Sequence, residues 1–471
     1  MQMPMRIQRL NNIKWFLEDS ALIDALKGLV SREDARRGYF NLDYQDKKAF
    51  VKFFAERGIS GSIRHIISPR GRKEYRLGKR LLEMSVPTPK PLGYGLSDIG
   101  SYVIQQWIEG DAFVDLFFEG KNRPELLNNL ADFLNLLKAQ KVLHNDLHLY
   151  NVIVCKDMLY LIDLHKMALK RHFNLKDEVS NLSHAITMLY DDMTEAEKEL
   201  FFNRYGVKDI RTHVENEMSR LWERWIRKKQ GRAFDNTSQM AVKGDCVYMT
   251  GRETLADEGP VELIKKDKKT IVERHSNHIR KIYRNKRRLK KAWENHVALK
   301  YLNLSVTPEP YCVKRPSLFS TGYIAMEDLG VSGEELDRHL DRTYDRMDKK
   351  ERKTFIAGLS SFFSVLFKKK IAHRDLKGCN IFVLNNGGFL LLDVEDIIFT
   401  HMNEERLKQM LTQLNTTIPK RISVKDRMRF YLKAAKDLKI DKKQVFKDVL
   451  RESLKSEIVY EGVGGLKREY W

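Results

Sequence analysis

The chain has 471 residues, of which 42% are hydrophobic and only 11 are proline, so its composition is that of a globular protein with enough apolar material for more than one domain. Its formal charge of +21 indicates an anionic partner, such as nucleic acid, an anionic membrane face or a phosphorylated substrate. No apolar run approaches the roughly 20 residues of a membrane-spanning helix, and no signal peptide is recognisable, so we expect a cytoplasmic protein.

The first half of the chain carries polar residues in a fixed order between apolar patterns. The strand pattern AFVKFF contains Lys52, and the helical pattern KEYRLGKRLLEM that follows contains Glu74. A second helical pattern, residues 125–141, places its apolar residues on one face. It leads into HNDLHLYN, residues 144–151, which supplies Asp146 and Asn151, and the next strand pattern ends at Asp163.

The second half repeats this order. The strand pattern HIRKIYR contains Lys281, and Glu294 stands before a Ser-Val pair as Glu74 does. The sequence HRDLKGCN supplies Asp375 and Asn380, and the strand FLLLD ends at Asp393. The repeat predicts two domains, residues 1–235 and 236–471, that meet near the polar stretch 228–245.

These residue types suit phosphoryl transfer, which depends on positioning and on charge neutralisation. In each copy a strand lysine (Lys52 or Lys281) can hold the ATP phosphates, and a helix glutamate (Glu74 or Glu294) can orient that lysine. Asp146 and Asp375 can accept the proton of an attacking hydroxyl. The remaining residues offer the oxygen ligands that Mg²⁺ prefers: Asn151, Asp163, Asn380 and Asp393. The alternative is that the histidines of both loops are core residues and the carboxylates cap turns.

The arrangement resembles the protein-kinase fold, which implies an α+β chain of two tandem bilobal domains, each with a small antiparallel-sheet lobe and a helical lobe. No Gly-x-Gly-x-x-Gly precedes either lysine, so a phosphate clamp would rely on backbone or on basic side chains such as Arg36, Arg37 and Arg274. The Asp-Phe-Gly triplet is replaced by residues 163–165 and 393–395, and no Ala-Pro-Glu follows. We therefore expect neither a phosphorylation-controlled activation loop nor a groove for protein substrates.

The first copy is also similar to the lipopolysaccharide core kinases of Gram-negative bacteria, through FVKFF, RKEYRLGKRLLEMSVPTP, HNDLHLYNVIV, YLIDLHKM and LKDEVSNLSHAI. The segment IDLH is the most specific of these, and the second copy resembles the same superfamily more loosely. The resemblance implies an ATP- and Mg²⁺-dependent kinase for Kdo or heptose hydroxyls of the lipopolysaccharide core or lipid A precursor. It also implies a peripheral location on the cytoplasmic face of the inner membrane.

The densest basic run, residues 264–291, has 13 Lys or Arg against Asp267 and Glu273, a net charge of +11 (13 − 2). It fits an anionic membrane surface or a solvated face equally well, and we find no nucleic-acid-binding module. The four cysteines form no zinc or disulfide pattern. Four hypotheses remain open: both copies are active, only one is, the acceptor is another small molecule or a protein, or the chain is a nucleotide-binding scaffold.

Overall fold

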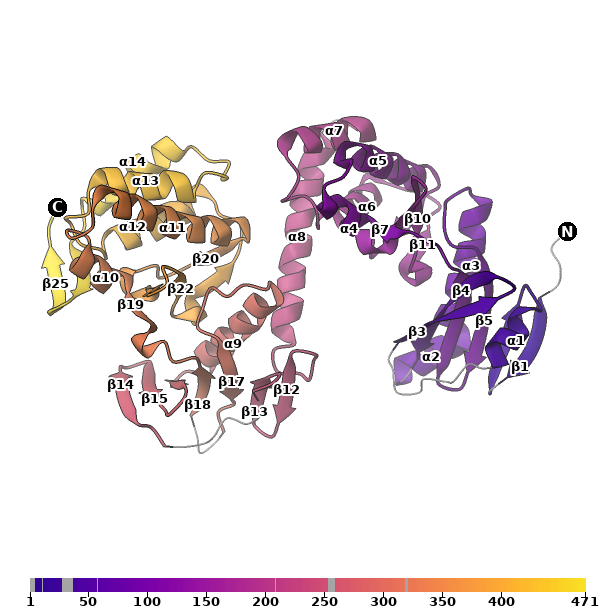
Figure 1. Cartoon of the computed structure of the whole chain (residues 1–471), viewed down its shortest axis with the longest axis horizontal. Helices are drawn as coiled ribbons and strands as arrows, with labels where there is room; N and C mark the ends of the chain where they lie inside the picture. The colour runs from indigo at the N-terminus through magenta and orange to yellow at the C-terminus, as the bar shows by residue number, and fades with distance from the viewer. Residues whose placement is uncertain are drawn as a thin grey trace. The chain divides into compact units, whose positions relative to one another are not determined.

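The structure is a computed structural model that describes residues 5–10, 12–27, 37–56, 58–207, 209–252, 259–317 and 321–471. The chain divides into two compact units, Met1–Leu221 and Trp222–Trp471, which are described separately below. Helix α8 (Ile210–Gly231) runs across the division (Figure 1). The sequence repeat predicts the boundary 14 residues later (235 − 221), in the polar stretch 228–245, whose first four residues form the end of α8.

Unit 1 begins with an antiparallel six-stranded sheet of order β1-β2-β5-β6-β4-β3. Aromatic and β-branched residues alternate on its strands and bury one face against helix α1 and the other against α3. Its elements are β1 (Arg6–Leu10), β2 (Ile13–Leu17), α1 (Leu22–Lys27), β3 (Arg37–Tyr44), β4 (Lys47–Ala55), α2 (Ile59–Ile67), α3 (Arg70–Glu83), β5 (Pro91–Ser97) and β6 (Gly100–Gln106).

The helical lobe of unit 1 packs around one apolar core to which α5 contributes five residues that the sequence had placed on a single face, together with Ala131. Leu126, also placed on that face, is only partly buried. The HNDLHLYN segment connects two small antiparallel sheets of this lobe, β11-β8 and β10-β9-β7. The elements are β7 (Asp111–Ala112), α4 (Phe113–Glu119), α5 (Arg123–Ala139), β8 (Val142–His144), β9 (Val152–Cys155), β10 (Met158–Leu161), β11 (Met167–Leu169), α6 (Leu175–Ile186), α7 (Glu195–Tyr205) and α8.

Unit 2 repeats the small lobe with a seven-stranded antiparallel sheet of order β12-β13-β17-β18-β16-β15-β14. Strand β16 holds the place of β4, and helix α9 the place of α3. The additional strand, β14, lies at the edge beyond β15. The elements are β12 (Met240–Lys243), β13 (Cys246–Met249), β14 (Glu262–Lys266), β15 (Thr270–Arg274), β16 (Ile279–Tyr283), α9 (Lys286–Tyr301), β17 (Pro310–Lys314) and β18 (Gly322–Met326).

The helical lobe of unit 2 has its own apolar core, and a C-terminal hairpin packs on α10. Its elements are β19 (Gly333–Glu335), α10 (Leu336–Thr343), α11 (Lys349–Lys368), β20 (Ile371–His373), β21 (Ile381–Leu384), β22 (Phe389–Leu391), β23 (Ile397–Phe399), α12 (Glu404–Asn415), α13 (Val424–Ala434), α14 (Lys442–Ser453), β24 (Ile458–Gly462) and β25 (Gly465–Glu469). The expected fold class, two tandem kinase-like bilobal domains, is confirmed.

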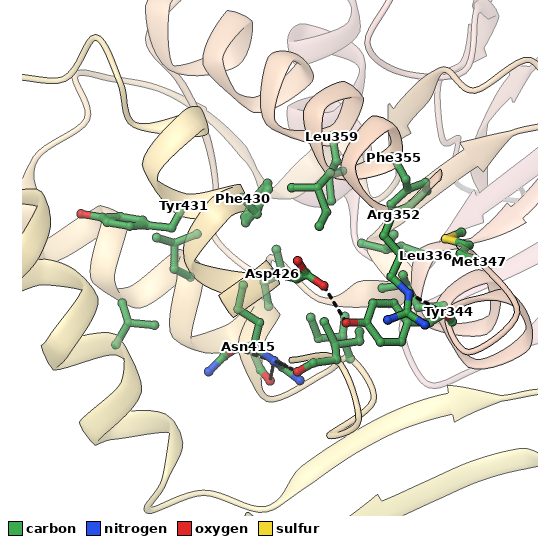
Figure 2. A pocket seen from close by; sticks show the side chains of 18 of the residues that line it. Leu336, Tyr344, Met347, Arg352, Phe355, Leu359, Asn415, Asp426, Phe430 and Tyr431 are labelled. Atoms are coloured by element: carbon green, nitrogen blue, oxygen red, sulfur yellow. Dashed lines mark hydrogen bonds between the residues drawn. The ribbon is translucent and has the colours of Figure 1, made fainter. Parts of the chain in front are cut away.

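An apolar cavity of about 70 Å³ lies between α10, α11, α12, α13 and α14 in unit 2 (Figure 2). Leucine, isoleucine and phenylalanine side chains make up most of its wall, with Tyr344 bonded to Asp426 at 2.8 Å on one side. It is far smaller than the roughly 300–1,000 Å³ of typical ligand pockets, and none of the predicted site residues lines it. Within the described part of the chain, no helix combines the length and apolar character that crossing a membrane requires.

Candidate active sites

In unit 1, four polar residues from three elements converge beneath the sheet. Strand β4 presents Lys52, whose ammonium pairs with Asp163 and lies 3.3 Å from Glu74 of helix α3. His165 completes the group, with its Nδ1 atom 2.6 Å from Asp163 and 3.7 Å from Glu74. Lys52, Glu74 and His165 are buried. The sequence prediction that Lys52, Glu74 and Asp163 meet is therefore realised geometrically.

The electrostatics of this cluster follow from burial and pairing. Burial raises the pKa of Glu74 above its usual range, even though Lys52 acts in the opposite direction. Burial also acts to raise the pKa of Asp163, but its hydrogen bonds with His165 and Lys52 and the charge of Lys52 together hold it well below its usual range. Asp163 is thus held as a carboxylate. Its φ of 61°, in the left-handed region that non-glycine residues seldom adopt, turns it out of the strand toward Lys52.

The HNDLHLYN segment is held in place by helix α6 and by its own side chains. Asn181 accepts from the His144 amide at 3.0 Å and donates to the Val142 carbonyl at 2.8 Å. Burial lowers the pKa of His144 to about 4, so this histidine is a neutral packing residue, as the sequence suggested. Asn151 donates to the Asp146 carbonyl at 3.0 Å, which directs its amide oxygen away from that carbonyl.

Asp146 has a partner that the sequence had not indicated. The Lys166 ammonium, from the 3₁₀ turn Leu164–Lys166 that follows Asp163, pairs with its carboxylate. Burial acts to raise the pKa of Asp146, but the hydrogen bond and charge of Lys166 outweigh it, so the pKa lies below its usual value. A base with a lowered pKa stays deprotonated, and therefore competent, to a more acidic pH.

Removing Lys166 reverses that shift. In a chain whose unit 2 is silenced by Asp375→Ala, we expect Lys166→Met to move the acidic limb of the kcat/KM profile to higher pH, because burial then acts on Asp146 without its cation. Lys170→Met is the matched control, since Lys170 pairs with Asp177 and not with Asp146. An acidic limb that stays in place with Lys166→Met would exclude Asp146 as the titrating base.

In unit 2 the strand lysine is paired differently. Lys281 on β16 lies 2.6 Å from Asp393 and 3.1 Å from Glu395, which is 2% exposed. Glu395 also accepts from Arg288 of α9 at 2.9 Å and from the Tyr283 hydroxyl at 3.1 Å. Burial by itself lowers the pKa of Lys281, but the phenol and the two carboxylates around it raise it above its usual range. Asp393 shares the left-handed backbone of Asp163, with φ 48°.

The prediction that Glu294 orients Lys281 is wrong. The Glu294 side chain, 19% exposed, lies 3.7 Å from Lys290 on its own helix, and no contact joins it to Lys281 in the described structure. Its predicted place beside the lysine is taken by Glu395. The buried carboxylate that contacts the strand lysine therefore comes from helix α3 in unit 1, and from the second residue after the strand aspartate in unit 2.

The cause is the register of helix α9. Helices α3 and α9 end in the same turn, with Ser85 and Asn303 at φ 58° and 53°, and the next amide donates back to a helix carbonyl at 2.9 and 3.1 Å. Counting back from this turn, the counterpart of Glu74 is Ala292, which is fully buried. The Ser305-Val306 pair, which resembles Ser85-Val86 in sequence, lies two residues beyond the matching turn.

The lysine that pairs with the proposed base also differs between the two units. Asp375 pairs with Lys377 at 3.0 Å, whereas the position that matches Lys166 is an acid, Asp396, which pairs with Arg374 at 3.2 Å. Asn380 donates to the Asp375 carbonyl at 2.7 Å, as its counterpart does in unit 1. Each proposed base thus has one lysine partner, supplied from a different position of the chain.

The donor atoms fit a hard divalent cation. The amides of Ile162 and Leu392 donate to the carbonyls of Asn151 and Asn380, both at 2.9 Å, so each strand end lies beside the loop asparagine. Asp163 and Asn151 in unit 1, and Asp393 and Asn380 in unit 2, offer oxygen donors of the kind that suit Mg²⁺. In unit 1, ligand atoms of Glu74, Asp163 and His165 also lie within 4.8 Å of one another. Because Lys52 already contacts this group, the Asp and Asn pair is the set that could hold a cation in unit 1.

Sequence reasoning missed Lys166 and Lys377 as partners of the two aspartates, and Glu395 as a partner of Lys281. Position alone could have pointed to Glu395, because it follows its strand aspartate at the same distance as His165 does. The basic stretch 264–291 does not form one free surface, since Arg274 pairs with Asp328 at 2.8 Å and with Glu262. Arg36 lies outside the described residues, and Arg37 begins strand β3.

One comparison with known proteins agrees with the geometry of unit 1. Residues 38–212 match the family model described as the RIO domain, a protein-kinase-like domain. Among solved structures, one titled "WaaP in complex with acyl carrier protein" is 20% identical and covers 44% of this chain and 89% of that chain, with a TM-score of 0.33. A similarity of that size supports no conclusion about substrate or partner. No curated protein matches the chain significantly.

The RIO-domain match covers the elements that carry Lys52, Glu74, Asp146, Asn151 and Asp163. Together with the bilobal fold, it identifies the chain as an ATP-dependent kinase. The resemblance to the protein-kinase-like superfamily that the sequence motifs indicated is confirmed.

Proposed function

We propose that this kinase transfers the γ-phosphoryl group of ATP to sugar hydroxyls, Kdo or heptose, of the lipopolysaccharide inner core, with one catalytic site in each unit. The observation that carries the choice of acceptor is the short connection after each strand aspartate. Helix α6 begins at Leu175, soon after Asp163, and helix α12 begins at Glu404, soon after Asp393. Neither connection leaves room for a protein-kinase activation segment that would hold a peptide.

The proposed roles follow from the contacts. Lys52 and Lys281 bind the ATP phosphates, and each is oriented by a buried carboxylate, Glu74 in unit 1 and Glu395 in unit 2. Asp146 or Asp375 accepts the proton of the sugar hydroxyl as its oxygen attacks the γ-phosphorus and ADP leaves.

Mg²⁺, when bound, supplies charge neutralisation at the phosphates. In unit 1 the residues that would hold it are Asn151 and Asp163, and in unit 2 they are Asn380 and Asp393.

The glycan acceptor is further supported by sequence and charge. The IDLH segment, residues 162–165, supplies both Asp163 and the histidine that contacts it at 2.6 Å, so the most specific motif of the resemblance is part of the site itself. The net charge of +21 suits a multiply anionic, membrane-anchored acceptor. Exposed cations of the basic stretch, among them Lys286 and Arg287, remain available to an anionic membrane surface.

The test is phosphate transfer by the full chain from labelled ATP to core lipopolysaccharide lacking phosphate, presented in anionic vesicles at low and high salt. Mass spectrometry of the released core should locate new phosphate on Kdo or heptose, at a rate that falls with salt. Parallel reactions offer an aminoglycoside, choline and an unfolded protein. Label only in one of those three would replace the proposed acceptor, and metal-dependent nucleotide binding without turnover would favour a scaffold. A rate independent of salt would contradict the membrane contact.

A further inference from the structure

The hairpin of β14 and β15 in unit 2 lies where protein kinases carry their glycine-rich loop, beside the strand that bears the phosphate-binding lysine. In this chain the hairpin, residues 261–274, contains no glycine. Its turn instead reads Lys-Asp-Lys-Lys, residues 266–269. The question is what replaces the backbone contacts that such a loop makes with phosphate.

The sheet register places one lysine of this hairpin on the same face as Lys281. Lys281 is directly opposite Val272 of β15, and Val272 is directly opposite Lys265 of β14. Directly opposite residues of antiparallel strands project from the same face of a sheet. That face is the one on which Lys281 contacts Asp393. The Cα atoms of Lys265 and Lys281 are two strand spacings apart, about 10 Å.

A β-bulge is responsible for this placement. The register between β14 and β15 shifts between Leu263 and Lys265, so Ile264 is the additional residue and Lys265 takes the position opposite Val272. Without the bulge, the apolar Ile264 would stand in the row of Lys281. Bulges of this kind are frequent beside active sites, where they re-aim a side chain.

Backbone amides of this turn, of the kind that a glycine-rich loop offers to phosphate, are already hydrogen-bonded within the turn. The Asp267 carboxylate accepts from the amides of Lys269 and Thr270, both at 2.7 Å, and the Asp267 amide donates to the Thr270 carbonyl at 2.9 Å. Because these amides already have acceptors, a phosphate contact at the hairpin requires a side chain. The Lys265 side chain is 66% exposed, and the ion partner it has, Asp267, is 3.8 Å away.

We propose that the Lys265 ammonium binds the β- and γ-phosphates of ATP in unit 2, as a side-chain replacement for the glycine-rich loop. The inference rests on the proposed function of unit 2 and adds a nucleotide-binding residue to it. Lys266 provides an internal comparison, because it follows Lys265 on the strand and therefore projects from the opposite face.

The test measures nucleotide binding by the full chain with unit 1 silenced by Asp163→Ala, using ATP and adenosine as separate probes in the presence of Mg²⁺. We expect Lys265→Ala to weaken ATP binding about 10-fold, the loss of one charge-assisted hydrogen bond, and to leave adenosine binding unchanged. Lys265→Arg should retain most of the affinity. Lys266→Ala should bind both probes as the parent chain does.

Three results would overturn the inference: unchanged ATP affinity in Lys265→Ala, an equal loss in Lys266→Ala, or an equal loss for adenosine. ATP binding by the parent Asp163→Ala chain distinguishes a failure of this inference from a failure of the proposed function. If the parent binds ATP and only the Lys265 effect is absent, the inference alone is wrong. If the parent binds no ATP, the proposed site in unit 2 is wrong and the inference is lost with it.

Discussion

The double substitution Asp146→Ala/Asp375→Ala lowers the rate of phosphate transfer by about 10²- to 10⁴-fold, the usual cost of losing a general base. Each single substitution removes only the phosphate transfer of the unit in which it lies. The structure supports this separation, because each aspartate lies in its own unit with its own lysine partner, Lys166 or Lys377. Initial rates and the positions of phosphate on the product measure the activity of each unit.

Asp191→Ala in unit 1 and Asp235→Ala in unit 2 are matched controls, because both side chains are exposed and lie in neither site. Their rates should equal that of the unaltered chain. A double variant that transfers phosphate at the unaltered rate would exclude both aspartates as bases. A chain whose entire activity disappears with Asp146→Ala would show that unit 2 does not turn over.

Glu395→Gln destabilises unit 2 by about 3 kcal/mol and weakens its nucleotide binding. Glu395 is a buried anion that contacts two cations, Lys281 and Arg288, and removing one charge of a buried pair leaves the other uncompensated. Hydrogen exchange measured by mass spectrometry should show about 100-fold faster exchange in peptides from β16 and α9. Peptides from unit 1 serve as the internal reference.

Glu294→Gln is the sharpest comparison for this prediction. Glu294 is the residue that sequence alone assigned to the same role, but it forms a partly exposed pair with Lys290 at 3.7 Å. Such pairs contribute about 0–1 kcal/mol, so exchange and nucleotide affinity should stay near those of the unaltered chain. If Glu294→Gln has the larger effect, the helix register described for α9 is wrong.

The sequence was sufficient to predict the repeated lobes, the two loops and the meeting of Lys52, Glu74 and Asp163, because each lies in a strongly patterned segment. It failed at Glu294, where the Ser-Val pair resembled unit 1 but the helix end is fixed by the left-handed residue Asn303. Asparagine is favoured at that position of a helix end, so the correct register was readable from turn chemistry.

Long-range partners were beyond sequence reasoning. Lys166 contacts Asp146, 20 residues before it, only because the turn after Asp163 folds back toward the loop. Lys377 is a local partner, two residues after Asp375, but no sequence pattern shows that its side chain turns toward that aspartate. The basic stretch 264–291 was left open between a membrane-binding surface and a solvated face, whereas its members are distributed between ion pairs, the site of unit 2 and solvent. Charge counted along a chain does not reveal this distribution.

The most direct test of two kinase sites in one chain is calorimetric titration with a non-hydrolysable ATP analogue and Mg²⁺. We predict two nucleotides bound per chain, one per chain in Asp163→Ala or in Asp393→Ala, and none when both substitutions are combined. A stoichiometry of one in the unaltered chain, abolished by either substitution alone, would contradict the assignment of an independent site to each unit.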